Sequence, residues 1–347
     1  MKRFFIDGLG GMAQGLFATL IIGTIIQQIG TFVGGQYGDL IYLVGKMAAA
    51  MTGAGIGVGV ARKFEADQLV VVSAATAGMV GAFASRLLAG TVLTEGNMLL
   101  AGPGEPLGAF LAAFVAIELG GLLSGKTKID ILITPCISIG TGSAVGLVLG
   151  PPISKFMTWI GSLINWGTEQ KPLVMGIVVS VLMGMLLTLP ISSAAIGVVL
   201  NLSGLAAGAA TIGCCCNMVG FAVASFRENG FGGLLAQGIG TSMLQVPNII
   251  KKPLIWLPAI LSSAILGPVG TLLLHMTNNA TGSGMGTAGL VGQIMTWQTM
   301  IQSEPQMVVL AKIIAIQVVL PAVVTLLFSE LMRKAKLIKP GDMKLEL

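Results

Sequence analysis

Residues 276–289 read Met-Thr-Asn-Asn-Ala-Thr-Gly-Ser-Gly-Met-Gly-Thr-Ala-Gly, a polar, glycine-rich run between two long apolar segments. The run is too polar to cross a lipid bilayer as an ordinary helix. Backbone that forms neither a helix nor a closed barrel is tolerated at membrane depth only where protein buries it or where it lines a water-filled cavity. We therefore interpret this stretch as a candidate binding loop inside a membrane protein.

The composition of the chain predicts an all-α polytopic membrane protein. Hydrophobic residues make up 54% of the 347 residues and charged residues 10%, whereas about 25% of a typical soluble domain is charged. The mean hydropathy is +0.91. Many apolar blocks have the roughly 17 to 25 residues that a spanning helix requires. The sequence has no sustained alternation of apolar and polar residues, which strands of an outer-membrane barrel would need. The net charge of +5 lies in short loops and the C-terminal tail, which argues against a nucleic-acid partner.

The apolar blocks predict about ten membrane spans and a helix at the membrane surface over residues 153–166. The expected spans are residues 12–33, 40–61, 69–90, 107–124, 131–150, 173–189, 196–212, 214–226, 254–274 and 308–328. Lysine and arginine alternate between successive loops in the first half of the chain. The positive-inside rule therefore predicts that both termini are cytoplasmic.

The pattern changes after Pro190, because polar and helix-breaking residues interrupt otherwise apolar sequence. We expect two re-entrant hairpins, near residues 230–250 and 276–297, that enter the membrane from opposite faces. Broken helices of this kind present backbone groups to a substrate near the bilayer midplane in many transporters. A channel would more simply show one filter-like loop or rings of charge. The pattern therefore favours a carrier.

The candidate substrate-binding residues are polar side chains of this second half. They are Asn201, Asn217, Gln237, Thr241, Ser242, His275, Asn278, Asn279, Thr281 and Ser283. Two interpretations of the opening stretch stay open, because its amides and hydroxyls could bind substrate hydroxyls or could satisfy one another and the broken backbone.

Several features favour structural roles over chemistry. His275 is the only histidine and has no carboxylate or second histidine nearby in sequence, so no metal site is expected. The glycines at 53, 55, 57 and 59 are typical of close helix packing. Walker loops, HExxH and other catalytic motifs are missing, so we expect neither an enzyme nor a cofactor.

Two stretches carry a resemblance to a known family. Residues 108–123 with the following Lys126-Thr-Lys-Ile-Asp-Ile-Leu-Ile-Thr-Pro135, and Gln245-Val-Pro-Asn-Ile-Ile-Lys-Lys-Pro-Leu-Ile-Trp-Leu-Pro258, resemble segments of bacterial phosphotransferase-system sugar permeases, the EIIC component. The similarity extends over residues 10–335. Within this clan the chain most resembles the small EIIC-like family that includes PfoR-type membrane regulators.

The resemblance implies a homodimer of ten-span protomers in the bacterial inner membrane, with an elevator-type motion. It implies a scaffold and dimerisation half (residues 1–170), a substrate-binding half (171–335) and a cytoplasmic tail (336–347). Separate phosphocarrier proteins, EIIA and EIIB, would supply phosphorylation. Sugar-phosphorylating relatives carry a Gly-Ile-x-Glu-Pro motif whose glutamate contacts the sugar, and here the matching residues 238–242 read Gly-Ile-Gly-Thr-Ser, without the glutamate.

These observations predict a transporter of a small polar solute, a carbohydrate or a related compound, within the lipid bilayer. Two alternatives stay open. One is a membrane sensor or regulator that binds a solute without net transport, and the other is a carrier that is not coupled to phosphorylation.

Overall fold

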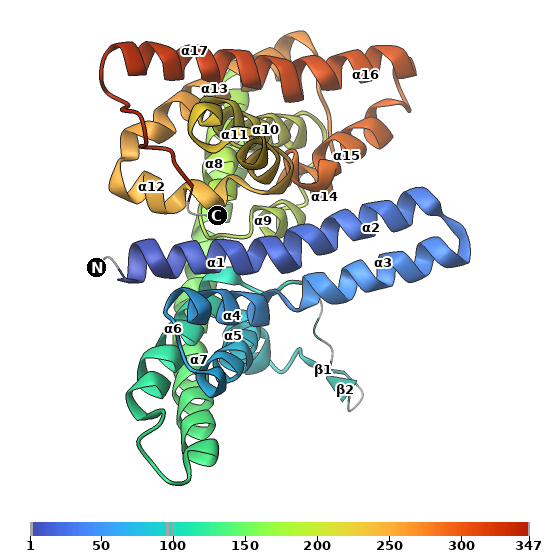
Figure 1. Ribbon diagram of the computed structural model, residues 1–347. Coiled ribbons are helices and arrows are strands. Elements are labelled where there is room, and N and C mark those ends of the chain that lie inside the picture. The colour runs from blue at the N-terminus through green and yellow to red at the C-terminus, as the bar shows by residue number, and fades with distance from the viewer. Residues whose placement is uncertain (1–2, 95–96, 99, 101, 346–347) are drawn as a thin grey trace. The chain divides into compact units, whose positions relative to one another are not determined.

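The computed structural model describes residues 3–94, 97–98, 100 and 102–345, and it is almost entirely helical (Figure 1). The chain divides into two compact units, Met1–Thr158 and Trp159–Leu347. Each unit is described by itself. The predicted all-α class is confirmed, with one antiparallel hairpin of two-residue strands, in which Leu93 pairs with Met98 and Thr94 with Asn97, as the small exception.

The first unit contains the elements up to the first part of α7. They are η1 Arg3–Gly8, α1 Leu9–Leu16, η2 Phe17–Ile21, α2 Ile22–Val33, α3 Gly35–Ala50, α4 Thr52–Lys63, α5 Gln68–Leu88, β1 Leu93–Thr94, β2 Asn97–Met98, α6 Pro106–Leu123 and α7 Asp130–Thr168. Here η denotes a short π-helical or 3₁₀-helical turn.

The second unit contains the remaining elements. They are α8 Pro172–Thr188, α9 Ser193–Val199, α10 Gly204–Ala224, α11 Phe226–Leu235, η3 Ala236–Gly240, η4 Ser242–Gln245, α12 Val246–Lys251, η5 Pro253–Trp256, α13 Leu257–Pro268, η6 Val269–Leu273, α14 Ala280–Ser283, η7 Ala288–Leu290, α15 Val291–Met300, α16 Gln306–Ile314, η8 Ala315–Val319 and α17 Leu320–Lys334.

Among the described residues, seven helical runs are long and apolar enough to cross a membrane. The count becomes eight when α3 and α4, which are bent by 52° relative to each other, are taken as one broken span. The apolar helix α8 is shorter, at 17 residues. The chain is therefore an integral membrane protein, and the count of ten spans stays a prediction.

Two expected boundaries differ from the structure. The separate crossings at 196–212 and 214–226 are wrong, because α10 continues through this region as one helix. Asn217 resembled a break in the sequence, but buried partners satisfy its amide within the unit. Likewise, the helix expected to end at Pro151 continues through both prolines to Thr168 as α7, so the predicted surface helix over 153–166 is the end of a longer helix. Neighbouring groups allow prolines inside membrane helices.

Glycines set the helix packing of the first unit, as the sequence predicted. A Cβ added to Gly11 of α1 would lie 2.6 Å from the carbonyl oxygen of Gly59 in α4, and one added to Gly53 would lie 2.7 Å from the carbonyl oxygen of Gly78 in α5. Backbones this close leave no room for a side chain. Helix α4 therefore packs against α1 and α5 through alternate glycines.

Helix α10 is the centre of the second unit, and most of its residues are buried. Helices α8, α13 and α17 pack around it. Side chains such as Ile212, Cys216 and Met276 fill its core.

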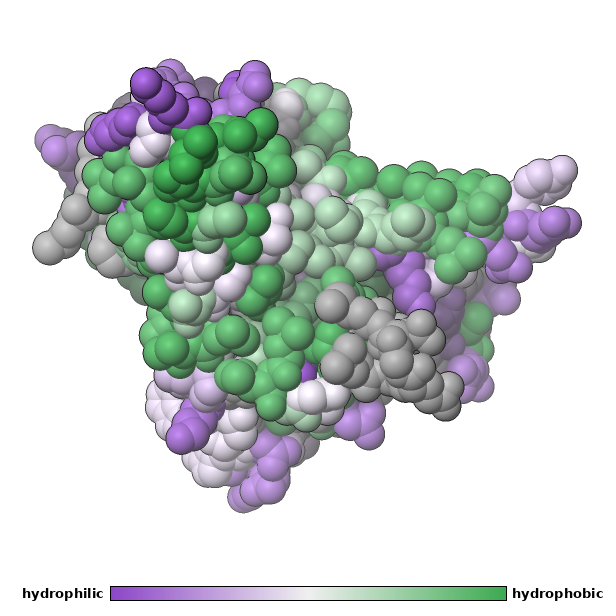
Figure 2. All heavy atoms as spheres, turned by 90° about the horizontal axis from the view of Figure 1, so that it is seen from below, coloured by the Kyte–Doolittle hydropathy of each residue, from purple (hydrophilic) through white to green (hydrophobic). Residues whose placement is uncertain are grey.

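Many outer side chains are apolar but exposed, including Met307, Val323 and Leu327 on α16 and α17. Figure 2 shows apolar residues over much of the face that it presents. Such surfaces suit contact with lipid chains.

Candidate functional site

The helical backbone of the second unit is interrupted at two places that meet in space, and we call residues 193–204 and 275–290 the central break. Asn278 donates its backbone N–H to the carbonyl oxygen of Gly204 at 3.2 Å, which forms an isolated antiparallel bridge between the two segments. The hydroxyl of Ser193 donates to the carbonyl oxygen of Gly284 at 2.7 Å. The short helices α9 and α14 therefore pack side by side.

The backbone of the central break departs from regular helix at defined residues. Asn201 and His275 have positive φ angles of 48°, an uncommon conformation for residues other than glycine. Gly286 and Gly289 have φ angles of 52° and 54°. The interruption predicted from the glycine-rich run at 276–289 therefore exists, although the predicted entry from one membrane face is untested.

The side chain of Asn278 lies at the centre of a buried polar network. Its amide nitrogen lies 2.8 Å from the hydroxyl of Thr211, 3.0 Å from the hydroxyl of Thr296 and 3.2 Å from the carbonyl oxygen of Gly292. Its carbonyl oxygen accepts the backbone N–H of Asn279 at 2.8 Å. Asn278 thus ties the extended segment 275–279 to α10 and α15.

Asn279 and Ser283 stabilise the short helix α14. The side-chain oxygen of Asn279 accepts the backbone N–H of Gly282 at 3.0 Å, which caps the first turn of the helix. The hydroxyl of Ser283 is buried and donates to the carbonyl oxygen of Ala280 at 2.8 Å. These two side chains have a structural function in this conformation.

Asn217 forms a second buried network, between α10, α8 and α13. Its side-chain oxygen accepts from the hydroxyl of Thr188 at 3.1 Å and from the indole nitrogen of Trp256 at 2.8 Å. The hydroxyls of Thr188 and Ser242 lie 2.8 Å apart. The amide nitrogen of Asn217 lies 3.5 Å from the hydroxyl of Ser263. The structure therefore brings two predicted site residues, Asn217 and Ser242, into one network.

Polar residues of the segment 226–252 form a third network. Gln237 is buried and donates to the hydroxyl of Ser225 at 2.9 Å, and its side-chain oxygen accepts from the amide of Gln245 at 2.8 Å. Gln245 in turn accepts from Asn248 at 2.9 Å. Thr241 caps the turn η4 by accepting the backbone N–H of Met243 at 3.1 Å.

This third network holds the C-terminal strap, which we define as residues 336–345. The carbonyl oxygen of Met343 accepts from the side-chain amides of Asn229 and Gln245 at 2.9 and 3.0 Å. Leu345 donates its backbone N–H to Asn229 at 2.8 Å. The Met343 side chain is fully buried in an apolar cluster with Ile249. The predicted tail therefore packs on the second unit up to residue 345, and its last two residues lie outside the described part of the chain.

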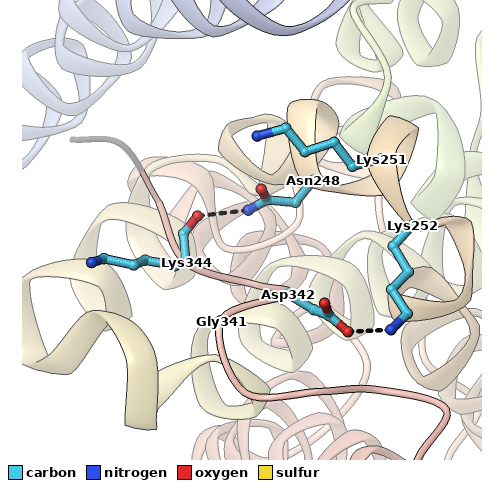
Figure 3. Close-up of a pocket in the computed structure, with 6 residues that line it drawn as sticks. All are labelled: Asn248, Lys251, Lys252, Gly341, Asp342 and Lys344. Atoms are coloured by element: carbon cyan, nitrogen blue, oxygen red, sulfur yellow. Dashed lines mark hydrogen bonds and ion pairs between the residues drawn. The ribbon is translucent and has the colours of Figure 1, made fainter.

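Ion pairs strengthen the attachment of the strap, and Figure 3 shows the one between Lys252 and Asp342. Arg333, just before the strap, contacts both carboxylate oxygens of Glu228 at 3.0 and 3.1 Å. The ammonium of Lys252 lies 2.6 Å from the carboxylate of Asp342. Partial burial acts to raise the pKa of Asp342, but the hydrogen bonds and charges of Lys252 and Lys339 outweigh this effect, so the pKa lies below its ordinary value.

Of the ten predicted site residues, three are exposed: Asn201, His275 and Thr281. All three belong to the central break. Asn201 comes three residues before Gly204 and Thr281 three residues after Asn278, and Gly204 and Asn278 form the antiparallel bridge. These are the side chains that a solute could reach without breaking the buried networks.

The sequence interpretation missed several residues that belong to these networks or lie beside them. Gln317, buried in η8, donates to the hydroxyl of Thr296 at 2.9 Å and extends the Asn278 network. It is the one side-chain amide in the predicted span 308–328. A polar side chain within a membrane span usually faces the protein interior, so its presence there could have indicated a buried role. The ammonium group of Lys312 lies 2.7 Å from the carboxylate of Glu304 and 2.8 Å from the carbonyl oxygen of Leu274, the residue that precedes His275.

Within the described ranges, no three histidine, cysteine or acidic side chains come together in a way that could hold a metal ion. The arrangement is instead one of amides, hydroxyls and interrupted backbone. Such groups can recognise a polar, uncharged solute through hydrogen bonds.

Comparison with known proteins then identifies the family. The comparison with curated protein sequences gives no significant match. The family model described as "Phosphotransferase system, EIIC" matches residues 6–345, which include both units and the strap. This confirms the resemblance at the level of the family. The chain belongs to the EIIC family of phosphotransferase-system permeases.

Proposed function

We propose that this protein transports a small polar solute, a carbohydrate or a related compound, across the bacterial inner membrane. The observation that carries the proposal is the EIIC family match over residues 6–345. EIIC proteins are the membrane-embedded permease components that work with phosphocarrier proteins. The interrupted helices of the second unit support a carrier, because transporters commonly bind solutes where helices are broken.

The central break is our candidate for the solute site. Thr281, Asn201 and His275 offer a hydroxyl, an amide and an imidazole at exposed positions. Asn278 and Asn279 position the loop through their own hydrogen bonds, so their contribution to the solute is indirect. Of the ten residues predicted from the sequence, three would then contact the solute directly. The others would shape the site.

We further propose an elevator motion, a homodimer formed through the first half, ten spans and cytoplasmic termini. The separation of the chain into two compact units supports a motion of one unit against the other. Exposed apolar residues such as Tyr37, Leu40 and Met47 on α3 give the first unit a surface for lipid or for a second copy. The basic loops in the sequence support cytoplasmic termini.

The test is uptake of radiolabelled sugars into proteoliposomes, with and without phosphorylated phosphocarrier proteins. Phosphorylated sugar in the lumen, dependent on the phosphocarriers, would support a permease of the phosphorylating type. Binding of a sugar without uptake under either condition would contradict transport and would favour the sensor.

A carrier without coupled phosphorylation is the second candidate, and one observation favours it. The motif that carries the sugar-contacting glutamate in phosphorylating relatives reads Gly-Ile-Gly-Thr-Ser at residues 238–242. Here Thr241 caps η4, and Ser242 is buried against Thr188. Uptake of unmodified solute that is indifferent to phosphocarriers would establish this alternative.

A further inference from the structure

The segment between Gly230 and Lys252 has a break in the helical backbone at each end. We call residues 231–251 the flap, which contains the second half of α11 followed by η3, η4 and α12. Gly230 has a φ of 59° and a ψ of −157°, a conformation that favours glycine, and a Cβ added there would meet nothing within 4 Å. Lys252 follows α12 with non-helical angles, and the next residue, Pro253, has no backbone N–H. The flap therefore has a candidate hinge at each end.

The inner side of the flap packs on α10 and α8 through buried polar groups. Gln237 donates to the hydroxyl of Ser225, at the end of α10, at 2.9 Å. The hydroxyl of Ser242 lies 2.8 Å from that of Thr188 at the end of α8. Gln237 and Ser242 are both fully buried. Movement of the flap would therefore separate Ser242 from Thr188 and uncover one end of the Asn217 network.

The strap is bonded to the chain beside both hinges. Next to the first hinge, the side-chain amide of Asn229 donates to the carbonyl oxygen of Met343 at 2.9 Å, and its oxygen accepts the backbone N–H of Leu345 at 2.8 Å. At the second hinge, the ammonium of Lys252 lies 2.6 Å from the carboxylate of Asp342 (Figure 3). The strap thus connects the two ends of the flap.

The strap also holds the flap itself. Gln245 donates to the carbonyl oxygen of Met343 at 3.0 Å, and Asn248 donates to the carbonyl oxygen of Lys344 at 2.9 Å. The Met343 side chain is fully buried in the apolar cluster that includes Ile249 of the flap. Because one buried side chain anchors the strap among these polar bonds, we expect the strap to be released as a unit.

We propose that the strap is a latch that holds the flap closed over the Asn217 network, and that its release lets the flap open at Gly230 and Lys252. Proteins open locally in cooperative units at a lower free energy than global unfolding requires. The latch thereby controls access to polar groups inside the second unit. It involves neither the residues of the central break nor any particular solute, so it can be tested without knowing what the protein carries.

The first test is amide hydrogen exchange of the full-length protein in detergent, followed by mass spectrometry. It compares wild type with Met343→Ser, which removes the buried anchor, and with Leu337→Ser. Leu337 is an exposed residue of the same strap, so the control makes the same kind of change without loss of burial. In Met343→Ser we expect peptides covering residues 236–245 to exchange roughly tenfold faster or more, while peptides of α10 keep their wild-type rates. Leu337→Ser should resemble wild type.

The second test locks the latch. Lys252→Cys and Asp342→Cys are combined in a Cys136→Ala background, because Cys136 is exposed whereas the other native cysteines are buried. A short bis-methanethiosulfonate linker then joins the two introduced cysteines, and a reductant releases them. Before linking, the lost ion pair should make the flap exchange faster than in wild type. Linking should slow this exchange severalfold, and reduction should reverse the effect.

Three results would overturn the proposal. One is wild-type exchange of residues 236–245 in Met343→Ser, and another is an equal acceleration of the α10 peptides, which would indicate loss of the whole unit. The third is exchange of the flap that does not change when the two cysteines are linked. The cysteine pair carries the test by itself if Met343→Ser does not fold.

Discussion

Replacing Asn278 with alanine should destabilise the second unit without any ligand present. The substitution removes the donors to Thr211 and Thr296 and leaves the backbone N–H of Asn279 without its acceptor. Thr211 and Thr296 keep other hydrogen bonds, to Ala207 and to Gly292, so the loss is partial. Because a buried polar group without a partner costs about 1 to 3 kcal/mol, we expect a total loss of about 2 to 4 kcal/mol.

The assay is the melting temperature of purified protein in detergent. For a unit of this size the expected loss corresponds to a decrease on the order of 5 to 10 °C. Thr281→Ala is the matched control, because Thr281 is exposed in the same segment and its replacement should change stability by about 0.5 kcal/mol at most. A double-mutant cycle with Thr296→Val should show non-additive losses. Equal melting temperatures for Asn278→Ala and Thr281→Ala would refute the structural role.

Three further substitutions test other parts of the structure. Burial raises the pKa of Glu105 to about 7, so its ionisation penalises the fold increasingly as pH rises from about 4.5 to 7. Glu105→Gln should therefore raise the free energy of unfolding by at most about 3 kcal/mol at pH 8, measured as a higher melting temperature, and by much less at pH 5. Gly11→Leu should prevent folding, measured by size-exclusion profile, because its side chain would enter the Gly59 backbone. Arg333→Ala should cost about 3 kcal/mol, because the largely buried carboxylate of Glu228 loses its cationic partner and keeps only the backbone N–H of Gly341, and protease should then cleave the strap faster.

The membrane-spanning helices were largely predictable from the sequence, because apolar length is a local property. The exceptions have tertiary causes. The sequence predicts two crossings where α10 is one helix, because polar residues such as Asn217 interrupt the apolar pattern after Pro190, yet Thr188 and Trp256 satisfy the Asn217 amide. Those partners lie 29 and 39 residues away in sequence, so no local pattern reveals them.

The candidate site was predictable as a region but not as a set of contacts. The glycine-rich run correctly indicated an interrupted backbone. The amides of Gln245 and Asn248 lay in a segment interpreted as a substrate hairpin, and the structure shows that they hold the strap. Their acceptors are the backbone carbonyl oxygens of Met343 and Lys344. Every residue has such a group, so the sequence does not indicate which ones accept these hydrogen bonds. Which side chains stay exposed, such as Thr281, likewise depends on packing.

The most direct test of the central claim is solute protection of a cysteine at position 281. Thr281→Cys would be made in a Cys136→Ala background, because Cys136 is exposed whereas Cys214, Cys215 and Cys216 are buried. The rate of maleimide modification is then measured with and without the sugar that the proteoliposome assay identifies as transported. If the central break binds the solute, saturating sugar should slow modification severalfold, while a non-transported sugar should have no effect. An unchanged rate at saturating transported sugar would contradict the assignment of the site.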